Sequence, residues 1–498
     1  MKRLILTTIP FLATILVSTA ANADSALVEH TTLGLMTELE AMRNPALHGF
    51  GYRTSFSQLS LGIDIQRQSQ AFVLEKGTGY TLPYLKVNTF HHLNSRSSVW
   101  GEASYTTGKQ HNIRWNSTSD YDLLQPYILA DTLGGDTRRE RYAISGGYAL
   151  RLGQWSLGAE MSVRAEQEYR QHDPRMRGIV TDLTMRLGGS YGLGRYRLGA
   201  MIEGNIYKQT NSVAFYREEG VIPEFQMTGL GTEYSRFSGD KRSLYYDGGG
   251  VALMLHASPI NQNGLYTDIT LDEHRYHRKL ADYNSMPLTD LYNEHAGVTI
   301  GWKRVRNYKI AVFGHFDYTR RTGNEHVGGT SDARYFPVIA CLTMYKSHLL
   351  NGYVGALLGK ANRHIVLTAG YTARSEEYVY PQRQLGTSHV FAQLQGQYFF
   401  RPSNKLWLTL NAQASYRACV SDEFVMPFAN MNANITQLMR HKYNYDKANH
   451  TTIGAKARAD YAWKNTRYGL FAELGGDFTF CSVGEHQTIF QSSIGITF

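Results

Sequence analysis

Two histidine groups contain the residue type that most often binds metal ions in proteins. His91 and His92 are adjacent, and His274 and His277 are three residues apart in the segment HRYH. In an extended strand, adjacent side chains and side chains three residues apart point to opposite faces. Neither group therefore brings two ligands to one ion, and we expect these histidines to lie at a rim or in a lumen without a metal.

Catalysis of hydrolysis would need a nucleophile with a base beside it, or two carboxylates placed together. The metalloprotease pattern His-Glu-x-x-His does not occur in the sequence. The segment HDPRMRG carries Asp173, Arg175 and Arg177, which would suit an anion. An Asp before Pro favours a turn, however, and Asp173 can hold Arg175 locally. We therefore predict that the protein is not an enzyme and has no cofactor.

Two further groups of residues have a structural interpretation. The segment LADTLGGD offers Asp131 and Asp136, but it lacks the spaced oxygen ligands of a calcium loop. Three cysteines are too few for a disulfide scaffold, and an odd number leaves at least one unpaired within the chain. Of the three pairings, Cys419 with Cys481 is favoured because both fall at the same end of predicted strands, although spacing cannot test the geometry.

The elements that carry these residues show a two-residue repeat. In residues 141–166, apolar side chains occupy every second position on both sides of a short Gly153-Gln154 turn, and polar side chains occupy the positions between them. This pattern is typical of a β-hairpin with one apolar and one polar face. Similar hairpins are predicted at 179–206, 296–318, 390–416 and 453–480.

The strand runs are longer than those of soluble sheets, and aromatic residues flank many of them, as in the interfacial girdles of membrane barrels. The polar faces carry both signs of charge, as in Lys456, Arg458 and Asp460, which suits a water-filled lumen better than a globular core. We predict an all-β fold, a transmembrane antiparallel β-barrel of about 18 strands, with 16 also compatible. A secreted β-sandwich or propeller is the alternative.

Loop lengths predict how the barrel is oriented. The short turns should be periplasmic, and the long connections should face outside. Residues 70–78 and Phe336-Pro337 are expected in loops. The predicted long outer loops are 108–138, 209–244, 275–292, 320–348 and 419–448.

Both termini carry features of an exported barrel. Lys2 and Arg3 precede an apolar stretch, and Ala21-Asn22-Ala23 has the small-x-small pattern of a cleavage site. We predict a signal peptide at 1–23, an N-terminal hatch-like segment at 24–50 and a barrel at 51–498. The protein is therefore expected in the outer membrane of a Gram-negative bacterium.

The last strand, TIFQSSIGITF, alternates in the same way. Ile494, Ile496 and Phe498 should face lipid, and this strand should pair with the first one, because an open edge is not tolerated in hydrocarbon. The terminal aromatic residue resembles the mark that the outer-membrane assembly machinery reads. The formal net charge of +9 is spread along 498 residues without a basic tract, which argues against a nucleic-acid partner.

Several segments together resemble a known family. They are RNPALHGFGYRTSFSQLSLG, QPYILADTLGGD, RRERYAISGGYAL, YRQHDPRMRGIVTDLTMRLGGSYGLGRYRLG and TGLGTEYSRFSGDKRSLYYDGGG. The chain is similar to a Bacteroidota-type outer-membrane β-barrel family of unknown function, most clearly over residues 40–260. The resemblance implies the fold, the location and a partnership with TonB-dependent receptors, and it implies no activity.

The motif Asn44-Pro45-Ala46 is similar to one in fatty-acid-transporter-like barrels, where it lies in an N-terminal hatch that enters the barrel. Leu35, Leu39 and Met42 have helical spacing, so a short helix is expected within residues 26–44. By this similarity the segment would plug the lumen. The alternative is a helix end followed by a proline turn into the first strand.

We therefore expect an accessory or scaffold barrel whose long outer loops bind another surface protein or cargo, in association with a TonB-dependent receptor. The alternative is a passive or substrate-selective porin-like channel, and a hydrolase at the rim is a third, weaker hypothesis. In a channel, lumen-facing charges would shape selectivity; these are Glu160, Arg164, Lys456, Arg458, Asp460 and Glu473.

Overall fold

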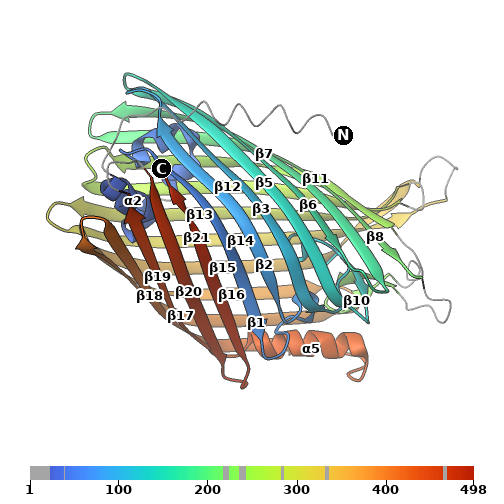
Figure 1. The fold of residues 1–498 in the computed structure, drawn as a ribbon. Coiled ribbons are helices and arrows are strands. Elements are labelled where there is room, and N and C mark those ends of the chain that lie inside the picture. The colour runs from blue at the N-terminus through green and yellow to red at the C-terminus, as the bar shows by residue number, and fades with distance from the viewer. Residues whose placement is uncertain are drawn as a thin grey trace, which may run out of the picture.

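The computed structural model describes residues 23–38, 40–216, 224–234, 243–281, 285–330, 336–463 and 468–498. Its main element is a closed sheet of 18 strands, so the predicted barrel and its strand count are confirmed (Figure 1). All pairings in this sheet are antiparallel, and each strand pairs with its neighbours along the chain. The barrel strands are β1 (Phe56–Gln68), β2 (Gly79–His92), β3 (Ser97–Ile113), β5 (Gly135–Leu152), β6 (Trp155–Tyr169), β7 (Arg175–Leu193), β8 (Tyr196–Ala214), β11 (Ser243–Pro259), β12 (Gly264–Leu280), β13 (Met286–Val305), β14 (Lys309–Gly328), β15 (Val338–Lys360), β16 (Arg363–Tyr378), β17 (Arg383–Ser403), β18 (Leu406–Val425), β19 (His450–Ala462), β20 (Gly469–Cys481) and β21 (His486–Thr497).

The barrel closes where β21 pairs with β1, as the sequence predicted. The register runs from Gln58 opposite Thr497 to Gln68 opposite Gln487. Ser57 and Phe498 exchange two backbone hydrogen bonds of 3.0 Å, so the last residue is part of the closing ladder. Ile494 and Phe498 are exposed on the outer wall, where a lipid-facing side chain must lie.

The two-residue repeat explains why these segments form barrel strands. In β6, Trp155, Leu157 and Met161 are about half exposed, while Ser156 between them is fully buried. The same alternation recurs around the barrel and places apolar side chains on the outside and polar ones toward the lumen. The lumen therefore has a polar wall that can hold charged groups.

One end of the barrel has short turns and the other has the long connections. At the short-turn end, β5 and β6 are joined by Gly153-Gln154, and both chain ends of the barrel, Phe56 and Phe498, lie there. At the long-loop end, residues 114–134 and 426–449 separate barrel strands. Residues 70–78 and Phe336-Pro337 lie between strands, as predicted.

Two predicted long loops are wrong. Most of the 275–292 segment is strand, because β12 extends to Leu280 and β13 begins at Met286. The 320–348 segment is also largely strand, because β14 extends to Gly328 and β15 begins at Val338. In 275–292 the alternation is inverted, because apolar side chains such as Tyr276 and Leu291 pack into the core inside the lumen, while Arg275 and Asp290 pair on the outer face.

The N-terminal segment before β1 folds into short helical turns at the short-turn end (Figure 1). They are α2 (Ala23–Thr31), η2 (Leu33–Thr37), η3 (Ala41–Arg43) and α3 (Pro45–Gly51). The short helix predicted within 26–44 is present only in part, because α2 ends at Thr31 and two short turns, η2 and η3, follow it; Leu39 lies outside the described residues. We call residues 23–55, as far as they are described, the N-terminal plug.

The long connections also carry elements of their own. These are η4 (Leu74–Lys76), α4 (Tyr121–Leu124), β4 (Leu129–Asp131), β9 (Glu224–Gly229), β10 (Thr232–Glu233) and α5 (Asn434–Asp446). Strands β4, β9 and β10 form a small separate sheet, and α5 lies at the long-loop end (Figure 1). We call residues 114–134, 224–234 and α5 the loop plug. Among the described residues, no helix is long and apolar enough to cross a membrane.

All three cysteines are free thiols. Cys419 lies on β18 and Cys481 on β20, and β19 runs between these two strands. Two strand spacings amount to roughly 10 Å, which is beyond the Cα separation of a disulfide. The predicted Cys419 to Cys481 pairing is therefore not formed.

Candidate functional site: a lumen held between two plugs

Asn44 attaches the N-terminal plug to the barrel wall. It is the N-cap of α3, where its Oδ1 accepts a hydrogen bond of 2.9 Å from Ala46 N. Its Nδ2 donates to the carbonyl oxygens of Ala200 at 3.0 Å and Gly189 at 3.4 Å, on strands β8 and β7. One buried amide therefore both starts the helix and joins it to the wall. Pro45 follows at the first helical position, where its missing N–H costs nothing.

Glycines on the wall let this helix start approach the strands closely. A Cβ at Gly188 would lie 1.9 Å from Asn44 Oδ1, and a Cβ at Gly158 would lie 2.4 Å from the carbonyl carbon of Pro45. Beside them, Ser156 Oγ donates a hydrogen bond of 2.8 Å to Ala46 O. The motif Asn44-Pro45-Ala46 therefore packs against the lumen side of β6, β7 and β8, where Pro45 begins α3.

An ion-pair group attaches the other part of this plug. Glu38 Oε1 lies 3.0 Å from Lys309 Nζ and 3.4 Å from Lys303 Nζ, and Lys309 also donates to Gly34 O. Burial alone would raise the pKa of Glu38, but the two ammonium groups hold it below its usual value. The carboxylate therefore stays charged and attaches η2 to strands β13 and β14.

Aromatic contacts complete the N-terminal plug. The His48 ring stacks on Trp100 of β3 with 4.2 Å between centroids, and His30 stacks on Tyr52 at 3.9 Å. Burial lowers the pKa of His48 to about 4, so the ring is neutral at ordinary pH. At the mouth, Phe50 lies between the guanidinium groups of Arg151 and Arg197, at 4.0 and 3.7 Å from its ring centroid.

The loop plug is packed very differently, because it forms a hydrophobic core with the lumen wall. Leu124, Tyr127, Leu129 and Ala130 are fully buried in that core. The core also includes Leu438 and Met439 of α5 and wall residues from many strands; among the wall residues are Met176, Val180, Tyr207, Val213, Leu244, Tyr246, Tyr276, Leu280, Leu291, Tyr345 and Tyr378. The long-loop half of the lumen is therefore filled with packed protein.

Buried arginine side chains connect this core to the strands. Arg278 of β12 is 1% exposed, and its guanidinium donates to Met227 O at 2.7 Å, to Ile128 O at 3.1 Å and to Gln226 Oε1. It thereby bonds backbone carbonyls of both inserted segments, and Ile128 O also accepts a hydrogen bond of 2.9 Å from Met227 N. Arg170 forms a second link, with its Nη1 2.9 Å from Asp131 Oδ2 in a pair that is almost fully buried.

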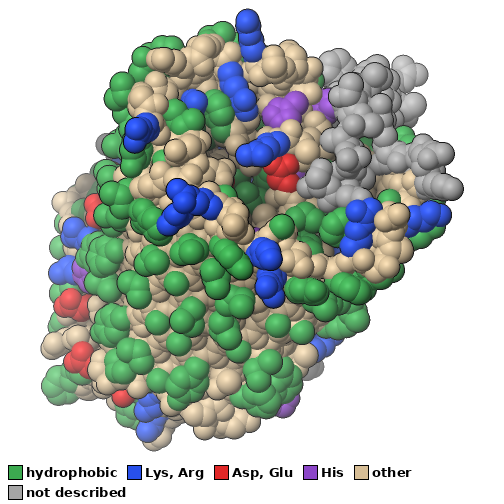
Figure 2. All heavy atoms as spheres, turned by 90° about the vertical axis from the view of Figure 1, so that its left-hand side faces the viewer, with side chains coloured by type: hydrophobic (Ala, Val, Ile, Leu, Met, Phe, Trp, Pro, Cys, Tyr) green, Lys and Arg blue, Asp and Glu red, His purple; other side chains and the backbone are tan. Residues whose placement is uncertain are grey.

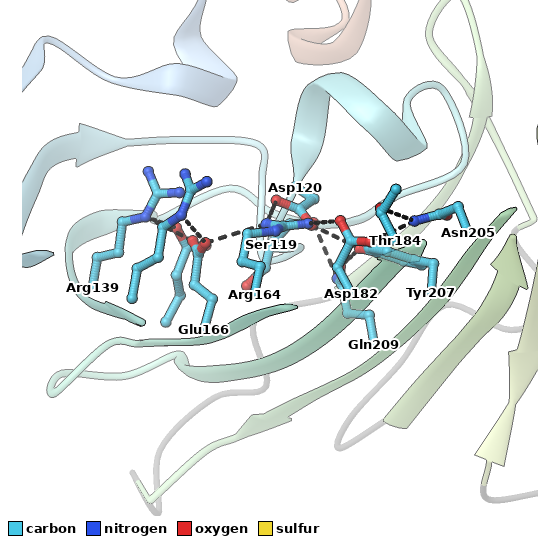
Figure 3. Close-up of polar contacts among 12 residues, drawn as sticks. Ser119, Asp120, Arg139, Arg164, Glu166, Asp182, Thr184, Asn205, Tyr207 and Gln209 are labelled. Atoms are coloured by element: carbon cyan, nitrogen blue, oxygen red, sulfur yellow. Dashed lines mark hydrogen bonds and ion pairs between the residues drawn. The ribbon is translucent and has the colours of Figure 1, made fainter. Parts of the chain in front are cut away.

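A polar network on β5 to β8 holds the start of the loop plug (Figure 3). Asp120 is bound in two-point fashion by Arg164, with Nη1 at 2.8 Å and Nη2 at 2.7 Å, and it also accepts a hydrogen bond from Tyr207. Asp120 has a positive φ of 52°, a conformation that aspartate tolerates better than most residues. Gln209 Nε2 donates to Ser119 O at 3.0 Å.

The network continues along the wall through a second carboxylate. Glu166 lies 2.6 Å from Arg139 Nε and 3.2 Å from Arg164 Nη1. Asp182 lies 3.1 Å from Arg164 Nη2. Because each of these charges has a nearby partner, water can be excluded between this wall and the loop plug without leaving an isolated buried charge.

A chamber of about 1240 Å³ remains in the lumen next to the N-terminal plug. About half of its lining side chains carry amides or hydroxyls; those from the strands are Gln58, Ser60, Tyr84, Asn88, Thr89, Ser104, Thr106, Ser145, Gln395, Gln397, Thr409, Asn411, Gln491, Ser492 and Ser493. Its charges are largely paired: Lys456 Nζ is 2.7 Å from Glu473, and Lys86 Nζ is 2.8 Å from Glu102. The chamber is therefore polar with little net charge.

The six charges predicted to shape a channel lie on the lumen side, but in two different settings. Glu160, Lys456, Arg458 and Glu473 line the chamber, and Asp460 pairs with Arg458 at 2.8 Å. Arg164 instead binds Asp120 of the loop plug. The sequence could not separate these roles, because strand alternation predicts the face of a side chain and not its partner.

The histidines and turns singled out in the sequence have structural partners. His274 pairs with Asp272 at 3.6 Å on the lumen side, whereas His277 pairs with Asp290 at 2.6 Å on the outer face. Within the described ranges, no group of three His, Cys, Asp or Glu side chains could hold a metal ion. Arg175 Nε lies 3.1 Å from Asp173, as expected for a local turn contact.

Residues 188–192, GGSYG, match the pattern of a serine nucleophile turn. In the structure they lie within the continuous strand β7, and Arg197 donates to Ser190 Oγ at 3.3 Å. No histidine or carboxylate is bonded to this hydroxyl in the described part of the chain, so the segment is a strand with small side chains. The roles of Glu38, Asp120 and Arg278 could not be predicted from the sequence, because their partners lie far away in the chain.

The model of a family of unknown function, DUF6850, matches residues 45–498. The chain belongs to the DUF6850 family. This agrees with the resemblance seen in the sequence to an outer-membrane barrel family without a known activity. No curated protein matches the DUF6850 chain.

Solved structures with a similar barrel include receptors and channels. The copper transporter OprC matches with a TM-score of 0.42 and 9% identity over 85% of the chain, which spans 62% of that transporter. The siderophore receptor PirA from Acinetobacter baumannii matches with a TM-score of 0.40 and 8% identity, over 89% of this chain and 80% of that one. The CymD monoaromatic hydrocarbon channel matches with a TM-score of 0.31 and 10% identity, over 92% and 91%. At these identities the likeness is one of barrel architecture.

Proposed function

We propose that this DUF6850 chain is an accessory barrel of the Gram-negative outer membrane that binds another surface protein or its cargo at the long-loop end. The observation that carries this proposal is the packed core of the loop plug inside the barrel. Arg278 ties that core to β12, and Arg164 and Arg170 tie it to β6 and to the residue directly after β6. A barrel filled in this way suits a rigid platform better than a passive pore, which needs a water-filled lumen.

The proposed orientation places the short turns in the periplasm and the loop plug outside. Cysteine labelling on intact cells tests it. A thiol introduced by Gln154→Cys, in a chain whose native cysteines are replaced by serine, should react with an impermeant maleimide only after permeabilisation. Phe428, which is fully exposed in the 426–449 connection, provides the matched outer position through Phe428→Cys. Labelling of position 154 on intact cells would reverse the orientation.

The proposed partner is a TonB-dependent receptor or another surface protein. The family resemblance supports this choice, and the filled lumen supports a role through surface contact. Purification from native outer membrane after cross-linking should recover one receptor at fixed stoichiometry, with cross-links mapped to the long-loop end. Cross-links confined to the outer wall of the barrel would contradict docking at that end.

Gated passage through the barrel is the second candidate, and the chamber of about 1240 Å³ favours it. We expect that a solute reaches this chamber from outside only if the loop plug moves. Ser104 lines the chamber, so a Ser104→Cys thiol should react with a small reagent added from outside only when a gate opens. Labelling of position 104 that appears only with the partner bound would support gating and argue against a static platform.

Planar-bilayer recording of the purified chain separates the platform from a passive porin. We expect no steady open-channel current, because the loop plug fills the long-loop half of the lumen. Large currents at low voltage in the unmodified protein would contradict the proposal that the barrel is a platform. The Gly188→Val variant is the control. It should displace the N-terminal plug and leave the loop plug in place, so its current shows how much conductance results from loss of the N-terminal plug alone.

A further inference from the structure

The turns at the short-turn end carry exposed cations on the outer face of β13 to β18. Lys360 and Arg363 flank the two-residue turn between β15 and β16, and both are exposed. Arg304 lies at the same end of β13, and Lys405 lies in the turn between β17 and β18. In Figure 2, Lys and Arg side chains gather at this end of the barrel, above a wall of hydrophobic side chains.

Lys360 and Arg363 are direct partners in the β15 to β16 ladder. Like charges placed opposite one another on one face of a sheet repel and destabilise the pair. In the outward rows that continue from them, Leu358 and Ile365 are 52% and 50% exposed, as expected for lipid-facing side chains. Two facing cations therefore lie at the edge of the apolar belt, where lipid headgroups begin.

No acidic residue offsets these charges locally. Residues 300–312, 356–368 and 397–411, which cover the three adjacent turns, contain no Asp or Glu. Lys360 Nζ instead lies 5.8 Å from the centroid of Tyr308, an aromatic residue of the kind that marks a membrane interface. The three turns therefore supply no carboxylate to balance the charges of Lys360 and Arg363.

The long-loop end of the neighbouring strands β11 to β14 provides a contrast. There the outward cations are paired with acids: Arg275 Nη2 is 2.5 Å from Asp290, and Lys279 Nζ is 2.8 Å from Asp247. Arg320 lies 3.6 Å from Glu294. These three outward cations therefore have acid partners, which the sequence does not supply in the turns around Lys360 and Arg363.

We propose that Lys360 and Arg363, assisted by Arg304 and Lys405, bind the phosphate of an anionic phospholipid in the leaflet around the short-turn end. A phosphate diester between the two side chains would relieve their repulsion and accept hydrogen bonds from both. The acyl chains would continue along Leu358 and Ile365. A zwitterionic headgroup would bind less tightly, because its own ammonium group competes with the two cations.

Native mass spectrometry of the purified full-length chain tests this proposal. The protein is titrated with phosphatidylglycerol or with phosphatidylcholine of the same acyl chains. We expect the unmodified chain to bind phosphatidylglycerol more tightly than phosphatidylcholine. The double variant Lys360→Gln/Arg363→Gln should bind phosphatidylglycerol at least roughly tenfold more weakly than the unmodified chain does. Binding of phosphatidylcholine should be almost unchanged in that variant.

A matched variant separates a site from general charge. Arg96→Gln/Arg195→Gln removes the same charge from two other exposed positions at the same end of the barrel. It should leave phosphatidylglycerol binding within about twofold, whereas Lys360→Arg should retain it. An equal loss in both double variants, or no preference for phosphatidylglycerol, would overturn the proposal.

A soluble anion provides the last arm of the experiment. Glycerol phosphate has the same phosphate chemistry without acyl chains, and we expect it to bind much more weakly than the lipid. If it competes at concentrations equal to those of the lipid, the site recognises a soluble phosphate and the lipid assignment is wrong. Heat-dependent mobility of every variant on gels confirms that each barrel is folded.

Discussion

The two plugs occupy one lumen but are attached in different ways. The N-terminal plug is fixed by a few polar links: Asn44 on β7 and β8, and Glu38 between Lys303 and Lys309. The loop plug is part of a hydrophobic core, with Arg278 and Arg170 buried in it. Loss of a few hydrogen bonds and ion pairs can release the N-terminal plug from the wall. Release of the loop plug would expose its hydrophobic core to water. The N-terminal plug is therefore the part that can move at low cost.

The largest effect is expected from breaking the buried ion pair of the loop plug. Arg170→Met leaves the Asp131 carboxylate buried without its cation, which costs about 3–5 kcal/mol. We expect a strong loss of thermal stability and new protease cleavage within 114–134. Arg175→Met is the control, because the Arg175 side chain is 46% exposed and its pair with Asp173 is screened by solvent, so its loss should cost less than about 1 kcal/mol. Equal effects of the two variants would contradict the proposed difference between the plugs.

A smaller effect is expected where the N-terminal plug touches the wall. Gly188→Ala places a Cβ 1.9 Å from Asn44 Oδ1, so the helix start must shift at a cost of about 1–3 kcal/mol. Hydrogen exchange of residues 44–51 should become faster while the barrel strands stay protected. Gly204→Ala on β8 is the control, because nothing lies within 4 Å of its added carbon. Unchanged exchange in Gly188→Ala would mean that the contact does not hold the plug.

Loss of the Asn44 side chain should come next. Asn44→Ala removes the helix cap and the two hydrogen bonds to the wall, at about 1–2 kcal/mol. Proteolysis of the N-terminal plug should become faster, with no change in the melting temperature of the barrel. Asn44→Asp keeps the cap but loses the donor to Ala200 O. Its rate of proteolysis should therefore lie between those of the unmodified chain and of Asn44→Ala. A drop in barrel melting temperature would show that the plug is needed for the whole fold.

The smallest effect is a pH dependence of the N-terminal plug. Burial lowers the pKa of His48 to about 4 from 6.5, so the folded plug binds fewer protons than the released one between these values. The contribution of His48 is full above pH 6.5 and falls as the pH drops toward 4. Exchange of residues 44–51 should therefore accelerate over this range, and His48→Gln should flatten the response. An identical pH response in that variant would exclude His48 as its source.

The sequence predicted the parts of this structure that depend on local alternation. Strand segments such as 141–166 and 453–480, the count of 18 and the closure through Phe498 follow from side chains that change face at every residue. The position of the N-terminal plug was suggested by Asn44-Pro45-Ala46, through a resemblance. The predicted loops at 275–292 and 320–348 failed; in the first, the apolar side chains face the core inside the lumen instead of lipid, which inverts the usual pattern.

The inward folding of the long connections could not be predicted in this way. Segment 114–134 contains Trp115, Leu124 and Ile128 among many polar residues, and nothing in its spacing distinguishes an outer loop from a buried one. Its burial depends on wall residues such as Tyr207, Arg278 and Tyr378, which are supplied by strands far away in the chain. The disulfide prediction failed for the same reason, because β19 lies between the two cysteines.

The sequence by itself therefore determined that this chain is a barrel, which side chains face outward and how its last strand closes it. Only the tertiary structure decided that the lumen is occupied, because occupation depends on pairs such as Asp120 with Arg164 and Asp131 with Arg170. The face to which a strand side chain points is a local property, because successive side chains along the backbone alternate between the two faces. A buried charge or apolar side chain is stable only beside a partner, and those partners meet only when the barrel closes.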